Sequence, residues 1–145
     1  MVALARQISF GTESPRLLLS GLDSLYVSYF IDMQNGRLDF DDLAYRRERL
    51  KESGRNKFEE VRLGSMSFAL QPYGSKPYSY VLENELLRIR LGEHIQPACH
   101  IQFYSRALMH LGLDRCQEMI GEWLQSLELS CKREEAVSRV DWAFD

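Results

Sequence analysis

The sequence predicts an α+β fold, a mostly antiparallel sheet with its helices packed on one face. Several segments alternate apolar and polar side chains with the two-residue period of a half-buried strand, and turn residues separate them. Two other segments place apolar residues on one helical face and interrupt the run of strands. We therefore expect the order β-α-β-β-β-α-β, with the second face of the sheet left open.

The first expected strand follows a lead-in, residues 1–20, for which partial disorder and an edge strand are both open. The segment SGLDSLYVSYFID is rich in residues that favour strands. Its apolar positions alternate with a second set that points to the opposite face. The apolar set is Leu25, Val27, Tyr29 and Ile31, and the opposite set is Tyr26, Ser28 and Phe30.

An amphipathic helix is expected next, because the apolar period changes after Asp39. The side chains that share its apolar face are Phe40, Leu43, Ala44 and Leu50. Acidic residues from Asp39 to Asp42 suit the positive end of the helix dipole, and Gly54 can end the helix.

Three further strands are expected between residues 59 and 105. Residues 59–73 read as one strand bulged at Gly64, and the sequence QPYGSKP supplies the turn after it. The segment YSYVLENELLRIRLG follows, in which Arg88 and Arg90 face away from the apolar positions. Residues 98–105 form the third strand, with His100, Gln102 and Tyr104 on the side opposite its apolar residues.

A second helix and a closing strand complete the fold. Asp114 can cap the helix, and an apolar stripe follows it. The stripe is Met119, Ile120, Trp123, Leu124 and Leu127. In the closing strand, residues 137–145, two sets of side chains point to opposite faces. Val140, Trp142 and Phe144 form the core set, and Arg139, Asp141, Ala143 and Asp145 form the other.

If these alternations hold, one polar surface extends over three strands. Its expected members are Arg88, Arg90, His100, Gln102, Tyr104, Arg139, Asp141 and Asp145. Tyr104 is the only one of the seven tyrosines that this interpretation places there. The arginines Arg88, Arg90 and Arg139 are candidate DNA phosphate contacts, although exposed arginines on a solvated strand are the alternative.

The composition fits one globular domain. The chain has 145 residues, 45% hydrophobic and 27% charged, so we expect a single α+β domain over residues 21–145. The formal net charge of −3 argues against a coat of basic surface, so any DNA contact must come from a local patch. Three cysteines without a CxxC pair and no signal peptide or apolar run of membrane-spanning length predict a soluble cytoplasmic protein.

The closing segment SRVDWAFD resembles the Arg-hydrophobe-Asp-x-Ala-x-Asp signature of the replication initiation factor family, the rolling-circle initiators of plasmids and phages. HIQFYSRALMHLGLDRC is similar to the family's strand, Ser-Arg-Ala-Leu turn and glycine before a helix. SGLDSLYVSYF resembles its opening Gly-hydrophobe-Asp strand. The matches extend over roughly residues 20–145 and are short, and SRVDWAFD is the specific one.

This resemblance implies a nicking and strand-transfer endonuclease in which a tyrosine attacks a DNA phosphodiester with the help of a divalent metal. A tyrosine hydroxyl is a weak nucleophile near neutral pH, so a metal that polarises the phosphate suits the reaction. Carboxylates favour Mg²⁺ or Mn²⁺. Asp141 and Asp145 match the family's two acidic positions and are the candidate metal ligands.

Strand geometry separates these two aspartates. Residues four apart on a regular strand lie about 13 Å from each other at roughly 3.3 Å per residue, so Asp141 and Asp145 share one ion only if the strand bends. Asp141 is the better single candidate. The alternative is that Asp141 forms an ordinary surface ion pair with Arg139 or Arg90.

Two weaker candidates come from the strand at residues 98–105. His100 and Gln102 resemble the His-hydrophobe-His metal motif of a different class of nicking enzymes, and a hydrogen-bonded or solvent-facing histidine is the alternative. Tyr104 is a weak candidate for the nucleophile, with base stacking or packing as the alternative role. In the resembled family the nucleophile follows the acidic strand, so we expect the catalytic tyrosine to lie outside this chain.

The leading hypothesis is therefore the N-terminal, DNA-binding part of a longer rolling-circle initiator. Its implied partners are the DNA of a replication origin and a host helicase, with no membrane; a homodimer stays open. The competing hypothesis is a non-enzymatic module that binds DNA or protein through the same sheet, with its aspartates serving as surface charge.

Overall fold

The computed structural model describes residues 22–54 and 57–142. Over these residues it has an α+β fold with two helices, a seven-stranded antiparallel sheet and a two-stranded sheet, which confirms the expected fold class. The expectations for residues 1–20 and for Asp145 lie outside the described residues.

The large sheet has the spatial order β3-β4-β5-β6-β7-β1-β9. Its strands are β1 (Leu22–Tyr29), β3 (Glu59–Leu63), β4 (Met66–Leu70), β5 (Tyr80–Glu83), β6 (Leu87–Leu91), β7 (Cys99–Tyr104) and β9 (Ala136–Trp142), while β2 (Ile31–Asp32) pairs with β8 (Ser130–Cys131).

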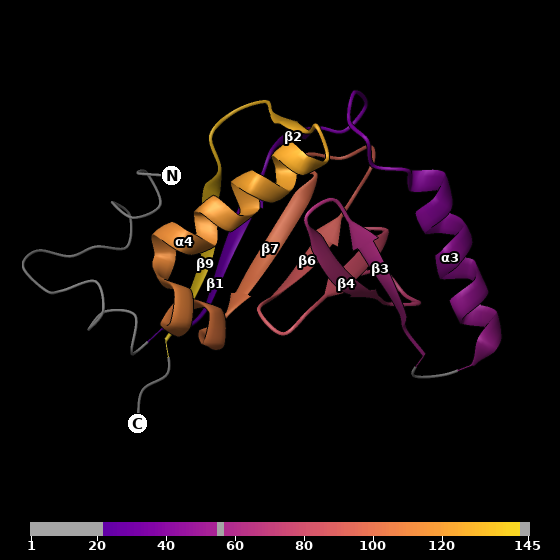
Figure 1. The fold of residues 1–145 in the computed structure, drawn as a ribbon, viewed down its shortest axis with the longest axis horizontal. Coiled ribbons are helices and arrows are strands. Elements are labelled where there is room, and N and C mark those ends of the chain that lie inside the picture. The colour runs from indigo at the N-terminus through magenta and orange to yellow at the C-terminus, as the bar shows by residue number, and fades with distance from the viewer. Residues whose placement is uncertain (1–21, 55–56, 143–145) are drawn as a thin grey trace, which may run out of the picture.

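Helix α4 (Ser105–Ser126) covers one face of the sheet, in front of β1, β7 and β9 in Figure 1. The Trp123 ring meets Phe68 of β4 edge to face at 5.8 Å, and its indole N–H donates to the carbonyl of Leu63 at 2.9 Å. The expected stripe on this helix is confirmed, because Ile120, Trp123, Leu124 and Leu127 are buried and Met119 packs against the core. The core therefore lies between α4 and the sheet.

Helix α3 (Phe40–Ser53) lies at the opposite end of the sheet from β9 (Figure 1). The expected ends are confirmed: the Asp39 side chain accepts a hydrogen bond from the Asp42 N–H at 3.0 Å, and Gly54 follows the helix with a φ of 120°. Phe40 packs against Tyr80 of β5 with 5.8 Å between ring centroids. Tyr80 is on the apolar side of β5, so both helices lie on the same face of the sheet.

The segment expected to be one strand bulged at Gly64 is instead a hairpin of β3 and β4. Gly64 has a φ of 56°, which reverses the chain rather than kinking it. A Cβ at Gly64 would lie 2.1 Å from the Ser126 hydroxyl, which also accepts the Ser65 N–H at 2.9 Å. The hairpin is therefore fastened to the end of α4.

The next segment also contains two strands, β5 and β6. Asn84 forms the turn, because its side-chain oxygen accepts the N–H groups of Leu86 and Leu87 at 2.9 and 3.1 Å. The second helix begins at Ser105 rather than near Asp114. It continues through a kink at Gly112, whose φ of 80° is outside the helical region.

Strand β9 pairs with β1 at the edge of the sheet. Its register shifts so that Ser138 is an extra residue, and both Val137 and Val140 pack against the core. Arg139 and Asp141 then lie on the opposite face, as the alternation predicts. Neither described helix combines the length and apolar character that a membrane-spanning helix needs.

Candidate nucleic-acid interface

The face of the sheet away from α4 gathers polar side chains from β5, β6, β7, β1 and β9. Cross-strand pairing aligns them in rows, since opposite residues of neighbouring antiparallel strands share a face. One row is Glu83, Arg88, Gln102, Tyr26 and Arg139; a second is Val81, Arg90, His100, Ser28 and Ala136; a third is Tyr104, Ser24 and Asp141. The described members of the predicted polar surface therefore do share one face.

A hollow of about 510 Å³ lies on this face, and we call it the His100 hollow. Its lining residues come from β1, β6, β7, β9 and the turn before β5. They are Tyr26, Ser75, Lys76, Tyr78, Arg90, His100, Ser138 and Arg139. These side chains include three basic groups and no acidic one, so the hollow favours an anion although the whole chain is acidic.

Aromatic rings line the hollow together with the basic groups. Tyr78 stacks on His100 with 6.2 Å between ring centroids and 22° between ring planes. The Tyr26 ring also contacts His100, in a tilted arrangement with 5.7 Å between centroids. The Arg139 guanidinium lies 5.0 Å from the centre of the Tyr26 ring. The result is a run of π surfaces with cations beside it, the combination that binds bases and phosphates of a single strand.

His100 is held neutral near pH 7. Burial lowers its pKa from the ordinary value, and the charge of Arg90 lowers it further. Its Nδ1 lies 3.3 Å from the Ser28 hydroxyl, which also donates to Ser138 at 3.4 Å. His100 is thus hydrogen-bonded, which is the alternative raised for it from the sequence.

Arg88 and Tyr104 meet at one carboxylate, that of Glu83. The Arg88 Nε donates to Glu83 at 2.6 Å, and the Tyr104 hydroxyl donates to the same oxygen at 2.9 Å. Burial and then the hydrogen bond to Glu83 raise the pKa of Tyr104 to about 12. Its phenolate is therefore rare at neutral pH, an arrangement that suits positioning better than nucleophilic attack.

Asp141 accepts a hydrogen bond from the Arg139 Nε at 2.8 Å. This is the ion pair raised as the alternative to a metal ligand. The register places Asp141 two strands from His100 and four residues farther along β1, so the two metal candidates are not brought together. Among the described residues, no group of three His, Cys, Asp or Glu side chains could hold a metal ion.

The structure adds several residues that the sequence analysis did not single out. Tyr26 lies on the polar face, so the expectation that Tyr104 is the only tyrosine there is wrong. Its position opposite Leu25 and Val27 in the first strand already carried this signal. Tyr78 and Lys76 reach the hollow from a turn, and strand alternation could not place them.

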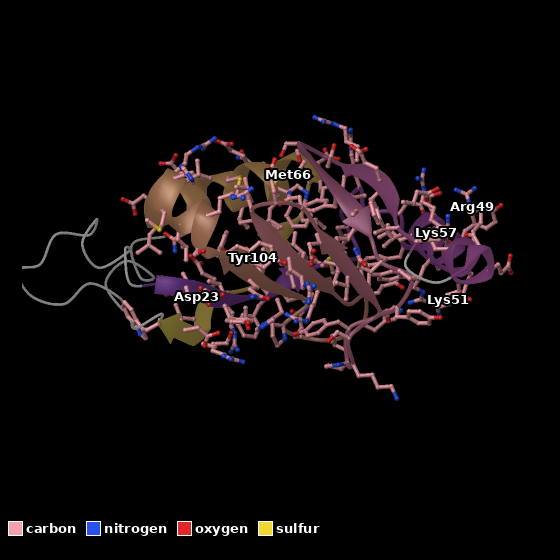
Figure 2. All side chains as sticks on the ribbon, turned by 90° about the horizontal axis from the view of Figure 1, so that it is seen from below. Asp23, Arg49, Lys51, Lys57, Met66 and Tyr104 are labelled. Carbon is pink, nitrogen blue, oxygen red and sulfur yellow. The ribbon has the colours of Figure 1, made fainter. Side chains whose placement is uncertain are left out.

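A second hollow, of about 630 Å³, lies beside the first, and we call it the Phe58 hollow. Its residues come from β5, β6 and the segments that precede β3 and follow β4. They are Lys57, Phe58, Gln71, Pro72, Tyr73, Val81 and Arg88. Figure 2 shows Lys57 at the α3 end of the molecule, whereas Tyr104 lies toward the middle of the sheet.

Comparison with models of known protein families gave no match, and neither did searches of curated proteins and of solved structures. A functional proposal therefore depends on the residues of the sheet face and on the sequence resemblance.

Proposed function

We propose that the protein binds DNA across the open face of its sheet, as the DNA-binding part of a rolling-circle replication initiator. The observation that carries the proposal is the His100 hollow, which is lined by Lys76, Arg90 and Arg139 together with stacked rings and has no acidic side chain among its lining residues. The resemblance of SRVDWAFD to the initiator family supplies the biological setting.

Arg90 is the central phosphate contact in this proposal. No ion pair joins it to an acidic side chain among the described residues, whereas Arg88 and Arg139 are each paired. A guanidinium that is already free of a carboxylate can bind a phosphate without first giving up a partner. The lowered pKa of His100 fits the same role, since a neutral imidazole offers a ring face and a hydrogen-bonding nitrogen.

The alternative function is a non-enzymatic module that binds DNA or protein. Two observations favour it over a nickase: Tyr104 is engaged with Glu83, and Asp141 is engaged with Arg139. The nicking reaction, its tyrosine and its Mg²⁺ or Mn²⁺ remain predictions that depend on the initiator hypothesis. DNA binding is common to the initiator and to one form of the module, so it is tested first.

The experiment is fluorescence anisotropy with a labelled single strand of about 12 nucleotides, a length within the range of comparable single-strand sites. Wild type is compared with Arg90→Gln and with the control Arg115→Gln, which removes an arginine from α4 instead. We expect Arg90→Gln to weaken binding about tenfold and to reduce the dependence of log K on log salt by about 0.7. Equal affinities for all three proteins would refute DNA binding at this face.

A thermal-shift titration with Mn²⁺ separates the initiator from the module. If Asp141 helps to hold a metal, Mn²⁺ raises the unfolding midpoint of the wild type but not of Asp141→Asn. Identical shifts for the two proteins would remove the metal site at Asp141 and leave the binding module. Mg²⁺, which keeps several of its waters and is usually bound by only one or two carboxylates, is the second titrant.

A further inference from the structure

We infer that the Phe58 hollow is a second base-stacking site, so that the preferred ligand is a single strand lying across both hollows rather than a duplex or a lone nucleotide. The inference rests on the proposed DNA binding and assigns its second contact. Phe58 and Tyr73 are the rings that would receive an unstacked base.

Both rings are unusually open to solvent. Phe58 is 64% exposed and Tyr73 is 65% exposed, and they line the same hollow. Single exposed apolar side chains are normal on protein surfaces, but two aromatic rings that share a hollow mark a binding surface. Stacking of a base on such a ring is sequence-tolerant, because every base has a π face.

The charges of the hollow fit a polyanion. Lys57 and Arg88 line it, no acidic residue does, and Lys51 of α3 lies 5.6 Å from the Tyr73 ring centre. Figure 2 shows Lys51 and Lys57 at the same end of the molecule. Arg88 is already paired with Glu83 and Lys51 with Glu48, whereas no ion pair joins Lys57 to an acidic side chain among the described residues. A phosphate of a nucleic acid would therefore bind Lys57, which an apolar peptide would leave without a partner.

The two hollows have neighbouring lining residues along the sheet. Val81 of the Phe58 hollow is the cross-strand partner of Arg90 in the His100 hollow. Arg88 lines the Phe58 hollow and Arg90 lines the His100 hollow, and both side chains point to the same face of β6. Their positions on the strand are about 7 Å apart at roughly 3.3 Å per residue. Tyr73 and Ser75 similarly line the two hollows from one turn. A single strand of DNA that leaves the His100 hollow therefore meets the Phe58 hollow.

The distance across the sheet determines the length of ligand that can contact both hollows. From β9 to β4 there are five inter-strand steps in the sheet order, or about 24 Å at roughly 4.8 Å per step. A single nucleotide cannot reach both ends. A flat row of stacking sites also suits unpaired bases, because the bases of a duplex are already stacked on each other.

The test compares Phe58→Ala/Tyr73→Ala with the control Tyr45→Ala, which removes a 65% exposed ring from α3 outside both hollows. Because these side chains are exposed, we expect the substitutions to have little effect on stability, and thermal unfolding measures that effect. The ligands are oligothymidylate of about 12 nucleotides, the matching duplex, and thymidine dinucleotide followed by NMR at the His100 imidazole. We expect the double variant to lose at least about tenfold affinity for the single strand and to bind the dinucleotide unchanged.

Three other results are decisive. Wild-type affinity of the double variant for the single strand would refute the second site and favour a protein ligand for the Phe58 hollow, while leaving DNA binding at the His100 hollow intact. Tighter binding of the duplex by wild type would refute the preference for an unpaired strand. If Arg90→Gln also binds the single strand as wild type does, the proposed function itself fails, and the inference fails with it.

Discussion

The hydroxyl of Tyr104 donates a hydrogen bond to the carboxylate of Glu83 at 2.9 Å, and this carboxylate also accepts from Arg88. The tyrosine and its acceptor come from β7 and β5, on either side of β6, so the bond crosses the middle strand of the polar face. The hydrogen bond that positions the tyrosine also raises its pKa, so it disfavours the phenolate that a nucleophilic role would need.

We predict that Tyr104 titrates near pH 12 and that Glu83→Gln lowers its pKa without restoring the ordinary value, because burial is the larger cause. A phenol whose pKa is higher in the folded state stabilises the fold below pH 10 and loses that contribution as the pH rises toward 12. NMR of ¹³C-labelled tyrosine, with Tyr104→Phe to identify the resonance, measures the shift. A pKa below 10 for Tyr104 would contradict the prediction and revive it as a nucleophile.

We predict that Asp141→Asn strengthens binding of single-stranded DNA about two- to fivefold in the presence of EDTA. The change frees the Arg139 guanidinium and removes a negative charge from the binding face. Stability should change little, because the Arg139 side chain is 64% exposed. Anisotropy and urea denaturation measure the two effects.

The control for this variant is Glu118→Gln, which removes an exposed carboxylate from α4. It should leave DNA affinity at the wild-type value. Weaker binding by Asp141→Asn without metal would mean that the aspartate supports the binding surface directly, contrary to the prediction.

The alternation of side chains was enough to predict the polar face. Buried Ile89, Ile101 and Val27 fix the register of three neighbouring strands, and the residues between them must then point away from the core. This local rule correctly placed Arg90 and His100 on one face of the sheet. It needs no knowledge of how distant segments meet.

The rest of the site depends on contacts that alternation does not encode. The hairpin at Gly64 was missed because a bulge and a turn both use a glycine within an apolar run. Tyr78 and Lys76 join the His100 hollow through a turn whose path is set by tertiary packing. The pairing of Arg139 with Asp141 was raised as an alternative, but the sequence could not decide between a partner and a metal.

We predict that Gly64→Ala destabilises the protein by about 1–3 kcal/mol and lowers its melting temperature by about 3–10 °C. The φ of 56° disfavours any residue with a Cβ, and the added atom would meet the Ser126 hydroxyl that binds the Ser65 N–H. Thermal unfolding followed by circular dichroism measures the loss.

Gly121→Ala is the matched control, since Gly121 is exposed on α4 and has open space around its Cβ position. There alanine should stabilise the helix by up to about 1 kcal/mol. Opposite signs for the two substitutions are expected, and equal effects would mean that the turn at Gly64 is not the one described.

The last prediction concerns His100, whose pKa should rise when DNA binds. In the free protein, burial and Arg90 lower this pKa, so the imidazole is neutral near pH 7. A phosphate beside Arg90 would offset the positive charge and favour the protonated ring. The titration midpoint of the His100 Hε1 resonance should move up on saturation with a single strand, and affinity should increase as the pH falls toward the lowered pKa of His100.

The chain contains its own controls for this measurement. His94 and His110 are exposed and lie in a loop and on α4, outside both hollows, so the chemical shifts of their rings at fixed pH should not change when DNA is added. His100→Gln should remove the gain in affinity at low pH. The free protein should also lose stability as the pH falls from about 6.5 through the lowered pKa of His100, because only the unfolded chain is then protonated there. A His100 midpoint that does not respond to DNA, together with DNA-induced chemical-shift changes at the His94 or His110 ring, would place the nucleic acid on another surface.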